Sequence, residues 1–261
     1  MPAVAAHYYY GQAVLKLLPE DIKKLIEGHK PAFDLGLQGP DILFYYKLWK
    51  KNAVVELGHE LHRQNADALI SRALKNMRSP DPDAQAYLLG FVCHFVLDST
   101  FHGRISQLAA EVVEHRLLES ELDRQILEKH CGSGQAKANR HDLIRIRAKQ
   151  LDSLKPLYPE LNSGILRESA RSFVFFTWLL DSKNILLKWL IGLSEKALHQ
   201  EGNFTSMMVH NERSEKYFEP AREICAGMSG VTSRGAEAVE NVHKCFEEDC
   251  ALPVSFEKNF L

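Results

Sequence analysis

The sequence lacks the features that mark several large classes of protein. Its five cysteines form no Cys-x-x-Cys pair, and its first residues do not form the basic and then apolar segments of a secretory signal. The longest apolar stretch, from Phe173 to Leu180, is broken by Thr177 and is too short to span a bilayer. We therefore expect a cytoplasmic protein with reduced thiols and no transmembrane segment.

Concentrated charge and strand signals are also missing. The net charge of −2 gives no reason to expect a basic surface that holds nucleic acid, so no stable nucleic-acid partner is expected. No pair of alternating apolar and polar runs flanks an Asn-Gly or Asp-Gly turn. Since the chain also lacks internal repeats and an evident linker, residues 1–261 are expected to form a single all-α domain of many helices.

Glycine, proline and capping residues divide the N-terminal half into expected helices. Asn52 is a suitable N-cap for one helix over residues 53–76, because its side chain can accept backbone N–H bonds. Gly103 is expected to separate the helix that ends near His102 from the next one. The other expected segments are helices over residues 8–18 and 19–29, a loop over 30–41, an aromatic-rich helical turn over 42–49, a break at 79–83 and a helix ending near residue 130.

The C-terminal half is expected to add further helices, the longest of which runs from Ser163 to His199. Its Phe/Trp-rich part, residues 173–193, has the spacing of a central core helix, which is favoured over a segment that touches a membrane surface. Two more helices, over about residues 205–228 and 233–249, complete the expected fold.

Two patterns of histidine and carboxylate carry the clearest chemistry. His94, Asp98 and His102 are four residues apart, and His115 and Glu119 repeat that spacing. An i, i+4 pair lies on one face of a helix, about one turn apart. Imidazole and carboxylate are ligands of Zn²⁺, and a bound cation would stabilise such polar groups within an apolar stripe. The two patterns predict a hydrolytic site for more than one metal ion.

The order and spacing of these residues resemble those of the zinc-dependent phospholipase C family, which is similar in fold and metal site to the S1/P1-type nucleases. That family has a His near the N-terminus, a later Asp, a His, then His-x₃-Asp, a further His and a closing His-x₃-Glu. The run FDLGLQGPDILFYY, residues 33–46, also looks like that of intracellular bacterial members. The matching positions here are His7, Asp41, His62, His94, Asp98, His102, His115 and Glu119.

Two histidines of the run LGHELHR compete for one of these positions. His62 follows a leucine, as in the family, and is favoured as the ligand. His59 is retained as an alternative ligand or as a group that supports one. The two are three residues apart and Glu60 lacks the position it has in His-Glu-x-x-His, so a zincin-type protease is disfavoured.

The resemblance implies a fold of the phospholipase C/P1 nuclease type with two or three zinc ions. Residues 1–130 would be the metal-binding half, and residues 131–261 would add helices. In the family, the third ion is completed by the N-terminal residue of the mature protein, and the Met1-Pro2 start departs from that pattern. The implied ligand groups are Asp41, His62, His94 and Asp98 for one ion, His102, His115 and Glu119 for a second, and His7 with a shared Asp98 for a third.

The implied activity is phospholipase C-like hydrolysis of a glycerophospholipid by a metal-activated water, with phospholipid or another phosphodiester as substrate. Asp41 is the expected catalytic residue, which would orient or deprotonate that water. The same site would serve a nuclease or another phosphodiesterase, and a non-catalytic metal-binding protein is a further alternative. An HD-type phosphohydrolase is disfavoured because the His141-Asp142 doublet lacks partners in the sequence.

Overall fold

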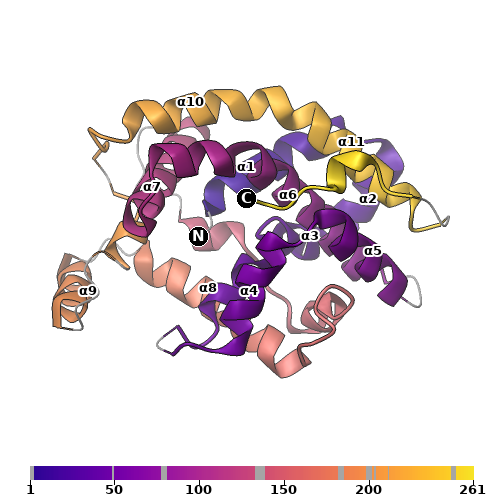
Figure 1. The fold of residues 1–261 in the computed structure, drawn as a ribbon, viewed down its shortest axis with the longest axis horizontal. Coiled ribbons are helices and arrows are strands. Elements are labelled where there is room, and N and C mark those ends of the chain that lie inside the picture. The colour runs from indigo at the N-terminus through magenta and orange to yellow at the C-terminus, as the bar shows by residue number, and fades with distance from the viewer. Residues whose placement is uncertain are drawn as a thin grey trace.

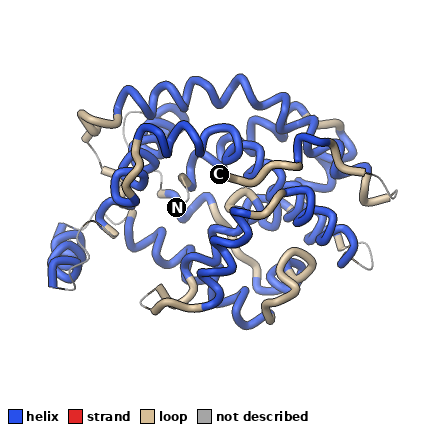
Figure 2. The backbone as a smooth tube through the Cα atoms, in the orientation of Figure 1, coloured by secondary structure: helices blue, strands red, loops and turns tan. Residues whose placement is uncertain are grey.

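The computed structural model describes the chain as helices joined by loops, over residues 3–48, 50–77, 81–132, 139–181, 185–197, 202, 204–210, 212–247 and 251–261. Within these residues there is no strand (Figure 2), which confirms the all-α fold. The α-helices are α1 (Val4–Leu17), α2 (Glu20–Gly28), α3 (Lys30–Gly36), α4 (Ala53–Arg63), α5 (Ala66–Asn76), α6 (Pro82–Leu108), α7 (Val112–Cys131), α8 (Ser163–Leu180), α9 (Ile185–Ala197), α10 (Phe218–Met228) and α11 (Thr232–Lys244). The 3-10 helices are η1 (Gly39–Tyr45), η3 (Arg140–Leu143), η4 (Ala148–Leu154), η5 (Thr205–Met207), η6 (Ser229–Val231) and η7 (Val254–Phe256).

Helix α6 is the element on which the others pack. It begins after Asp81, whose side chain accepts backbone N–H bonds from Asp83 and Ala84 and so caps the helix. Every residue from 86 to 97 is buried, as expected for a helix that is apolar on all sides. Helices α1, α3 and α11 lie against it (Figure 1). The predicted row of ligands therefore stands on an interior element.

Two glycines allow α3 to approach α6 at backbone distance. A Cβ atom added to Gly36 would lie 2.2 Å from the carbonyl oxygen of Tyr87, and one added to Gly90 would lie 2.3 Å from that of Phe33. A side chain at either position would separate the two helices, so both positions require glycine. This contact holds η1, which follows α3, beside α6.

Long-range hydrogen bonds tie both ends of the chain to the same region. On α1, the backbone N–H of Ala6 donates to the buried carboxylate of Asp123 in α7 at 3.0 Å. Near the C-terminus, the N–H of Phe260 donates to the carbonyl oxygen of His62 at 3.2 Å. The first bond links α1 to α7, and the second links the C-terminal segment to α4.

Two glycine-based expectations for the N-terminal half are wrong. The expected loop over residues 30–41 is largely helical, because Gly36 packs within α3 against α6 and Pro40 suits the first turn of η1. Gly103 does not end a helix, because α6 continues to Leu108. A glycine inside a helix costs about 1 kcal/mol relative to alanine, which the packing of α6 offsets.

Two expected long helices are each divided in two. The helix expected over residues 53–76 is interrupted at Gln64, whose backbone is extended, although Asn52 caps its first half as predicted. The helix expected from Ser163 to His199 ends its first part at Asp181, whose carboxylate binds the guanidinium of an arginine in η3. The last residues expected for that helix lie outside the described part of the chain.

The Phe/Trp-rich stretch is not a core helix throughout. Phe173 and Thr177 of α8 are buried, but Phe175 and Trp178 on the same helix are exposed, as is much of α9. The preference for a core helix is therefore wrong for these exposed positions. Across the described residues, none of the helices has the length and apolarity needed to cross a membrane.

The cysteines differ in state. Cys93, Cys131 and Cys225 are free. Cys245 is disulfide-bonded, so the expectation of reduced thiols is wrong at that position.

Candidate metal centre

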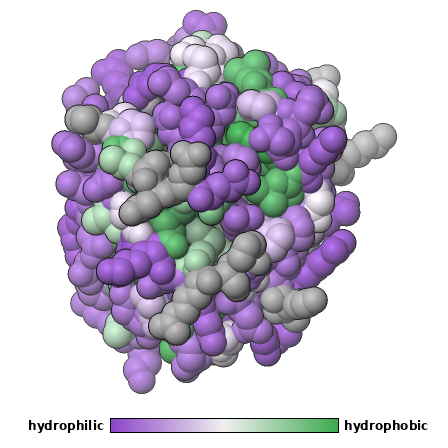
Figure 3. Space-filling model, turned by 90° about the vertical axis from the view of Figure 1, so that its right-hand side faces the viewer, coloured by the Kyte–Doolittle hydropathy of each residue, from purple (hydrophilic) through white to green (hydrophobic). Residues whose placement is uncertain are grey.

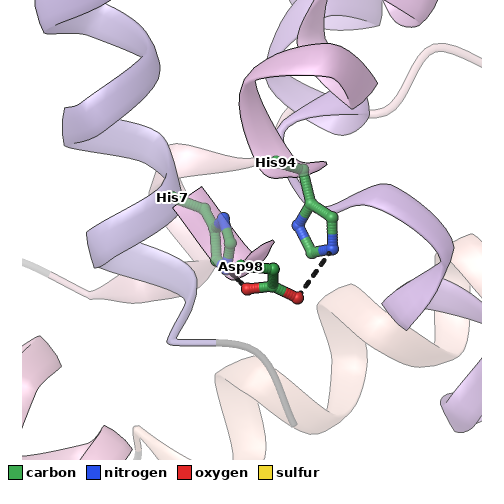
Figure 4. A group of neighbouring side chains, drawn as sticks. All are labelled: His7, His94 and Asp98. Carbon is green, nitrogen blue, oxygen red and sulfur yellow. Dashed lines mark ion pairs between the residues drawn. The ribbon is translucent and has the colours of Figure 1, made fainter. Parts of the chain in front are cut away.

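Asp98 of α6 lies between the imidazoles of His7 and His94 (Figure 4). Its Oδ1 atom is 3.1 Å from Nε2 of His7, and its Oδ2 atom is 3.3 Å from Nε2 of His94. The His7 ring, on α1, stacks on the His94 ring with 4.3 Å between centroids. The two oxygens of one carboxylate thus face two different imidazoles, an arrangement that would allow Asp98 to bridge two metal ions. The further ligand considered at Met1 or Pro2 lies outside the described residues.

Asp41 and His62 form a second pair. The Oδ1 atom of Asp41, in η1, is 3.1 Å from Nε2 of His62, in α4. Nδ1 of His62 lies 2.7 Å from the carbonyl oxygen of Gly58, so its N–H donates there and Nε2 is directed at Asp41. A backbone carbonyl that orients an imidazole in this way is the usual support for a metal ligand.

Ligand atoms of three residues lie within 4.8 Å of one another in two groups, and His94 belongs to both. Nδ1 of His94 is 3.2 Å from the carbonyl oxygen of Leu37, which leaves Nε2 as the nitrogen that could bind a metal ion. This buried Nε2 lies within ion-pair distance of Asp98 but makes no hydrogen bond to any of the described residues. An imidazole nitrogen has one lone pair and binds one ion, whereas the two oxygens of Asp98 can join neighbouring ions. The orphaned nitrogen and the mixed donor set fit zinc. The groups are His7, His94 and Asp98, and Asp41, His62 and His94.

The backbone before Asp41 is held tightly against His94. Gly39 has a φ of 52°, in the left-handed region, and a Cβ atom added there would lie 2.3 Å from Cδ2 of His94. The hydroxyls of Tyr87 and Tyr158 donate to the Gly39 carbonyl at 3.2 and 3.3 Å. η1 therefore carries Asp41 to His94 through an approach that only glycine permits.

His102, His115 and Glu119 lie along the same cavity, but the described residues do not close a third group there. Nε2 of His115 is 3.4 Å from Oε1 of Glu119, and the rings of His102 and His115 are 5.0 Å apart. A residue eight positions after His94 is about 12 Å further along α6 and rotated by about 80° around it. The row of predicted ligands on α6 therefore winds around the helix, and His102 faces a different position from His94 and Asp98.

His59, the alternative ligand, lies one turn before His62. Its ring packs against Phe44 with 4.7 Å between centroids, and it lines the cavity. Burial lowers its pKa. Neither group of ligand atoms includes it, so the structure brings His62 rather than His59 beside Asp41.

Six of the eight candidate ligands line an open cavity of about 490 Å³, and His7 and His94 are buried outside its lining. The acidic residues of its lining are Asp41, Asp98 and Glu119, all of them predicted ligands. If metal ions neutralise these carboxylates, the remaining charge of the lining is positive. The basic residues of the lining other than histidine are Lys50, Lys51, Arg63 and Arg116.

Sequence reasoning missed two parts of this lining. Arg116 directly follows His115 on α7, and that adjacency was the signal that could have identified it. Leu261 reaches the cavity because Phe260 is hydrogen-bonded to α4, and the ring of Phe260 packs 5.3 Å from that of His62. No local pattern in the sequence indicates that contact.

Charges in the cavity stabilise one another. Burial opposes the ionisation of Asp98, but the neighbouring His94 and His7 outweigh it and hold the pKa of Asp98 below its usual range. Burial also opposes the ionisation of Asp41, yet the hydrogen bond and charge of His62 keep the pKa of Asp41 at about 2. Burial lowers the pKa of His94 to about 4. Asp41, Asp98 and His94 therefore have the protonation states that metal binding requires. Burial is outweighed at His7 and His62 by the neighbouring carboxylates, which raise the pKa of each, so each of these must lose a proton to bind a metal.

Comparison with known proteins gives one match. A family model described as zinc-dependent phospholipase C matches residues 6–170, more than half of the chain, and this range includes every predicted ligand. No curated protein and no solved structure matches significantly. Helices α9, α10 and α11 lie beyond the matched range.

Proposed function

The chain belongs to the zinc-dependent phospholipase C family, and on this premise we propose that it is a zinc-dependent phosphodiester hydrolase that cleaves glycerophospholipids. In the proposed reaction, water attacks the phosphorus atom and the bond from phosphorus to the glycerol oxygen breaks. The products are diacylglycerol and the phosphorylated headgroup. The proposed ligands of two or three zinc ions are His7, Asp41, His62, His94, Asp98, His102, His115 and Glu119.

One observation carries the proposal. Two carboxylates and three imidazoles from four separate elements converge, largely buried, and Asp41, His62 and Asp98 among them line a cavity that is open to a substrate. Burying such groups without a cation is costly. A purely structural zinc site is closed by four protein ligands, whereas a catalytic site keeps a position open. The openness of the cavity therefore supports catalysis over metal binding alone.

The residues of the chain have separate roles in this proposal. When bound, zinc ions lower the pKa of water to about 7 and neutralise charge on phosphoryl oxygens. Asp98 holds His7 and His94 in register, and Asp41 orients the attacking water by accepting a hydrogen bond from it. Arg116, half-buried in the cavity lining, offers a positive charge to the phosphate. The departing glycerol oxygen takes up a proton from solvent.

The basic lining favours a second candidate, a nuclease or another phosphodiesterase. Lys50, Lys51 and Arg63 could contact the further phosphates of a polyanionic substrate. Arg63, however, is ion-paired with Glu56 at 2.9 Å, so part of this charge is neutralised. A substrate with a single phosphodiester therefore stays the first candidate.

Metal content and a panel of substrates test the proposal. Elemental analysis is expected to give two or three zinc ions per chain. Rates with zinc are then compared for a chromogenic phosphocholine diester, a phospholipid in detergent micelles and single-stranded nucleic acid. If kcat/KM is highest on the phospholipid, the result supports a phospholipase. If it is highest on nucleic acid, the result supports a nuclease. Zinc without turnover of any of the three would favour the non-catalytic alternative, and absence of zinc would overturn the metal centre.

A further inference from the structure

Helix α9 presents an apolar face to the outside of the molecule. Leu186, Trp189, Leu190 and Leu193 are 62%, 60%, 47% and 49% exposed. Their spacing of i, i+3, i+4 and i+7 places them on one side of the helix, and we call these four residues the α9 face. Soluble proteins rarely expose a contiguous group of large apolar residues unless that surface contacts a partner.

The opposite side of α9 is anchored to the protein. Glu195 is buried, and its carboxylate accepts hydrogen bonds from the backbone N–H groups of Phe204 and Thr205 and from the Thr205 hydroxyl. The last two bonds measure 2.9 and 2.8 Å. Ile191, also on the inner side, packs against the core. These contacts hold the α9 face outward.

The α9 face lies at the margin of the molecule. Figure 1 shows α9 apart from the other helices, at the left, near the end of α8. That end of α8 carries the exposed Phe175 and Trp178. Phe204, to which Glu195 is bonded, lines the cavity of the candidate metal centre. The face at the right of Figure 1, seen in Figure 3, is predominantly hydrophilic, with smaller hydrophobic patches.

Charges next to the α9 face favour an anionic partner. Among the described residues of α9, Lys196 is the exposed charged residue. Glu195, the acidic residue of this helix, is buried and hydrogen-bonded, so it does not offset the charge of Lys196 at the surface. On α8, Arg171 is exposed one turn before Phe175. The exposed acid of that face, Glu168, interacts electrostatically with Lys47. The uncompensated charge around the apolar residues is therefore positive.

We propose that α9 is an interfacial helix that docks the protein on an anionic lipid surface. A helix with Trp and Leu on one side and basic residues at its edge is typical of segments that lie in the membrane interface. Trp189 would lie at headgroup level, and Lys196 and Arg171 would contact anionic headgroups. Four side chains on one short helix offer less than the roughly 800 Å² per partner that a stable dimer buries, so a second copy fits less well. Docking goes beyond the chemistry proposed for the metal centre, because it requires no turnover.

Vesicle flotation with the full chain tests this proposal. The vesicles contain phosphatidylcholine alone or equal parts of phosphatidylcholine and phosphatidylglycerol. Binding is measured with zinc and again with a chelator, because without zinc the protein cannot hydrolyse the vesicle lipids during the measurement. The parent is expected to float with the anionic vesicles, and a Trp189→Ser, Leu193→Ser double variant is expected to lose at least tenfold in partition. Lys196→Glu is expected to weaken binding to anionic vesicles only. Leu17→Ser, which changes an exposed leucine of α1, is the matched control and is expected to bind like the parent.

Three outcomes would overturn the docking proposal. The first is that the parent does not float with anionic vesicles. The second is that the double variant floats like the parent, and the third is that Leu17→Ser loses as much binding as the double variant. A changed oligomeric state of the double variant with unchanged vesicle binding would assign the α9 face to contacts between copies, also against the proposal. Hydrolysis of a water-soluble phosphodiester is expected to be equal in parent and variants. Absence of that hydrolysis in the parent would refute the proposed function and leave the docking result standing.

Discussion

Replacing Asp98 with asparagine tests the candidate metal centre most directly. The change preserves the size of the side chain but removes a negative charge that lies 3.1 Å from Nε2 of His7 and 3.3 Å from Nε2 of His94. Loss of a group that only supports a ligand lowers metal affinity roughly 10–100-fold, so loss of a bridging ligand should cost more. We expect the variant to lose at least one zinc ion per chain. We also expect kcat/KM for phosphodiester hydrolysis to fall about 10³-fold, which is about 4 kcal/mol of transition-state stabilisation.

The effect on the fold itself is expected to be smaller. Without metal, the change removes the charge-assisted contacts of Asp98 with two histidines, at a cost of about 1.5–3 kcal/mol. Asp34→Asn is a matched control, because Asp34 is also largely buried, pairs with Lys30 and accepts a hydrogen bond from Gln12 at 3.1 Å. Asp34 does not line the cavity. The control is therefore expected to lose stability but to keep its zinc and its activity.

Three measurements decide between these expectations: elemental analysis after gel filtration, kcat/KM on a chromogenic phosphocholine diester, and urea unfolding in the presence of a chelator. If Asp98→Asn keeps its zinc and hydrolyses the diester within tenfold of the parent, Asp98 does not bridge metal ions and the proposed centre is wrong. Equal loss of activity in the Asp34 control would assign the effect to lost stability instead.

Three further perturbations address the backbone, the metal and the buried charge. Gly39→Ala is expected to cost at least about 2 kcal/mol in urea unfolding and to weaken zinc binding, because its methyl group would lie 2.3 Å from His94 at a positive φ. Gly28→Ala is the control, because a methyl group there would have nothing within 4 Å. Equal stability of the two variants would contradict the tight approach of Gly39 to His94. Chelation is expected to lower the unfolding free energy by about 2.7 kcal/mol for each zinc site, if free zinc was present at about 100 times the Kd of that site. A Tm that does not rise again when zinc is added back would argue against specific sites. Burial raises the pKa of Asp123 to about 6, above the ~3.9 of an unfolded chain, so the folded state binds more protons in that window. Stability from this group is then lost as pH rises from about 4 to about 6, by up to about 3 kcal/mol, and Asp123→Asn should remove this slope from the urea midpoints.

The local part of the site follows from the sequence alone. His94, Asp98 and His102 recur with the helical period, which backbone geometry fixes. His7 and Asp41 belong to distant elements, so only the resemblance to a family indicated them. Asp41 reaches His94 through the backbone contact between α3 and α6 and the positive φ of a glycine, whereas His7 is placed by α1, which is hydrogen-bonded to α7. The sequence around a glycine does not indicate which distant helix will pack against it.

Tertiary contacts also explain the errors in the fold. Gly103 was expected to break a helix, but α6 continues through it to Leu108, and the buried run of residues 86–97 earlier in the same helix outweighs its weak propensity. The Leu and Trp residues of α9 have the spacing of a core helix, and the same spacing serves a helix that is exposed. Whether the apolar side of a helix is buried depends on the elements that pack against it. The periodicity of the helix itself does not indicate whether such elements are present.

The separation of the ligands along the chain has a consequence for the order of events during synthesis. The proposed ligands come from α1, η1, α4, α6 and α7, and the two groups that share His94 draw on four elements spread between residue 7 and residue 98. Until α6 is synthesised, a growing chain offers each of these groups at most two ligands, too few for firm capture. The ion should reach a chain whose topology is already formed, so zinc would act as a late ligand of a folded protein rather than as a template for folding.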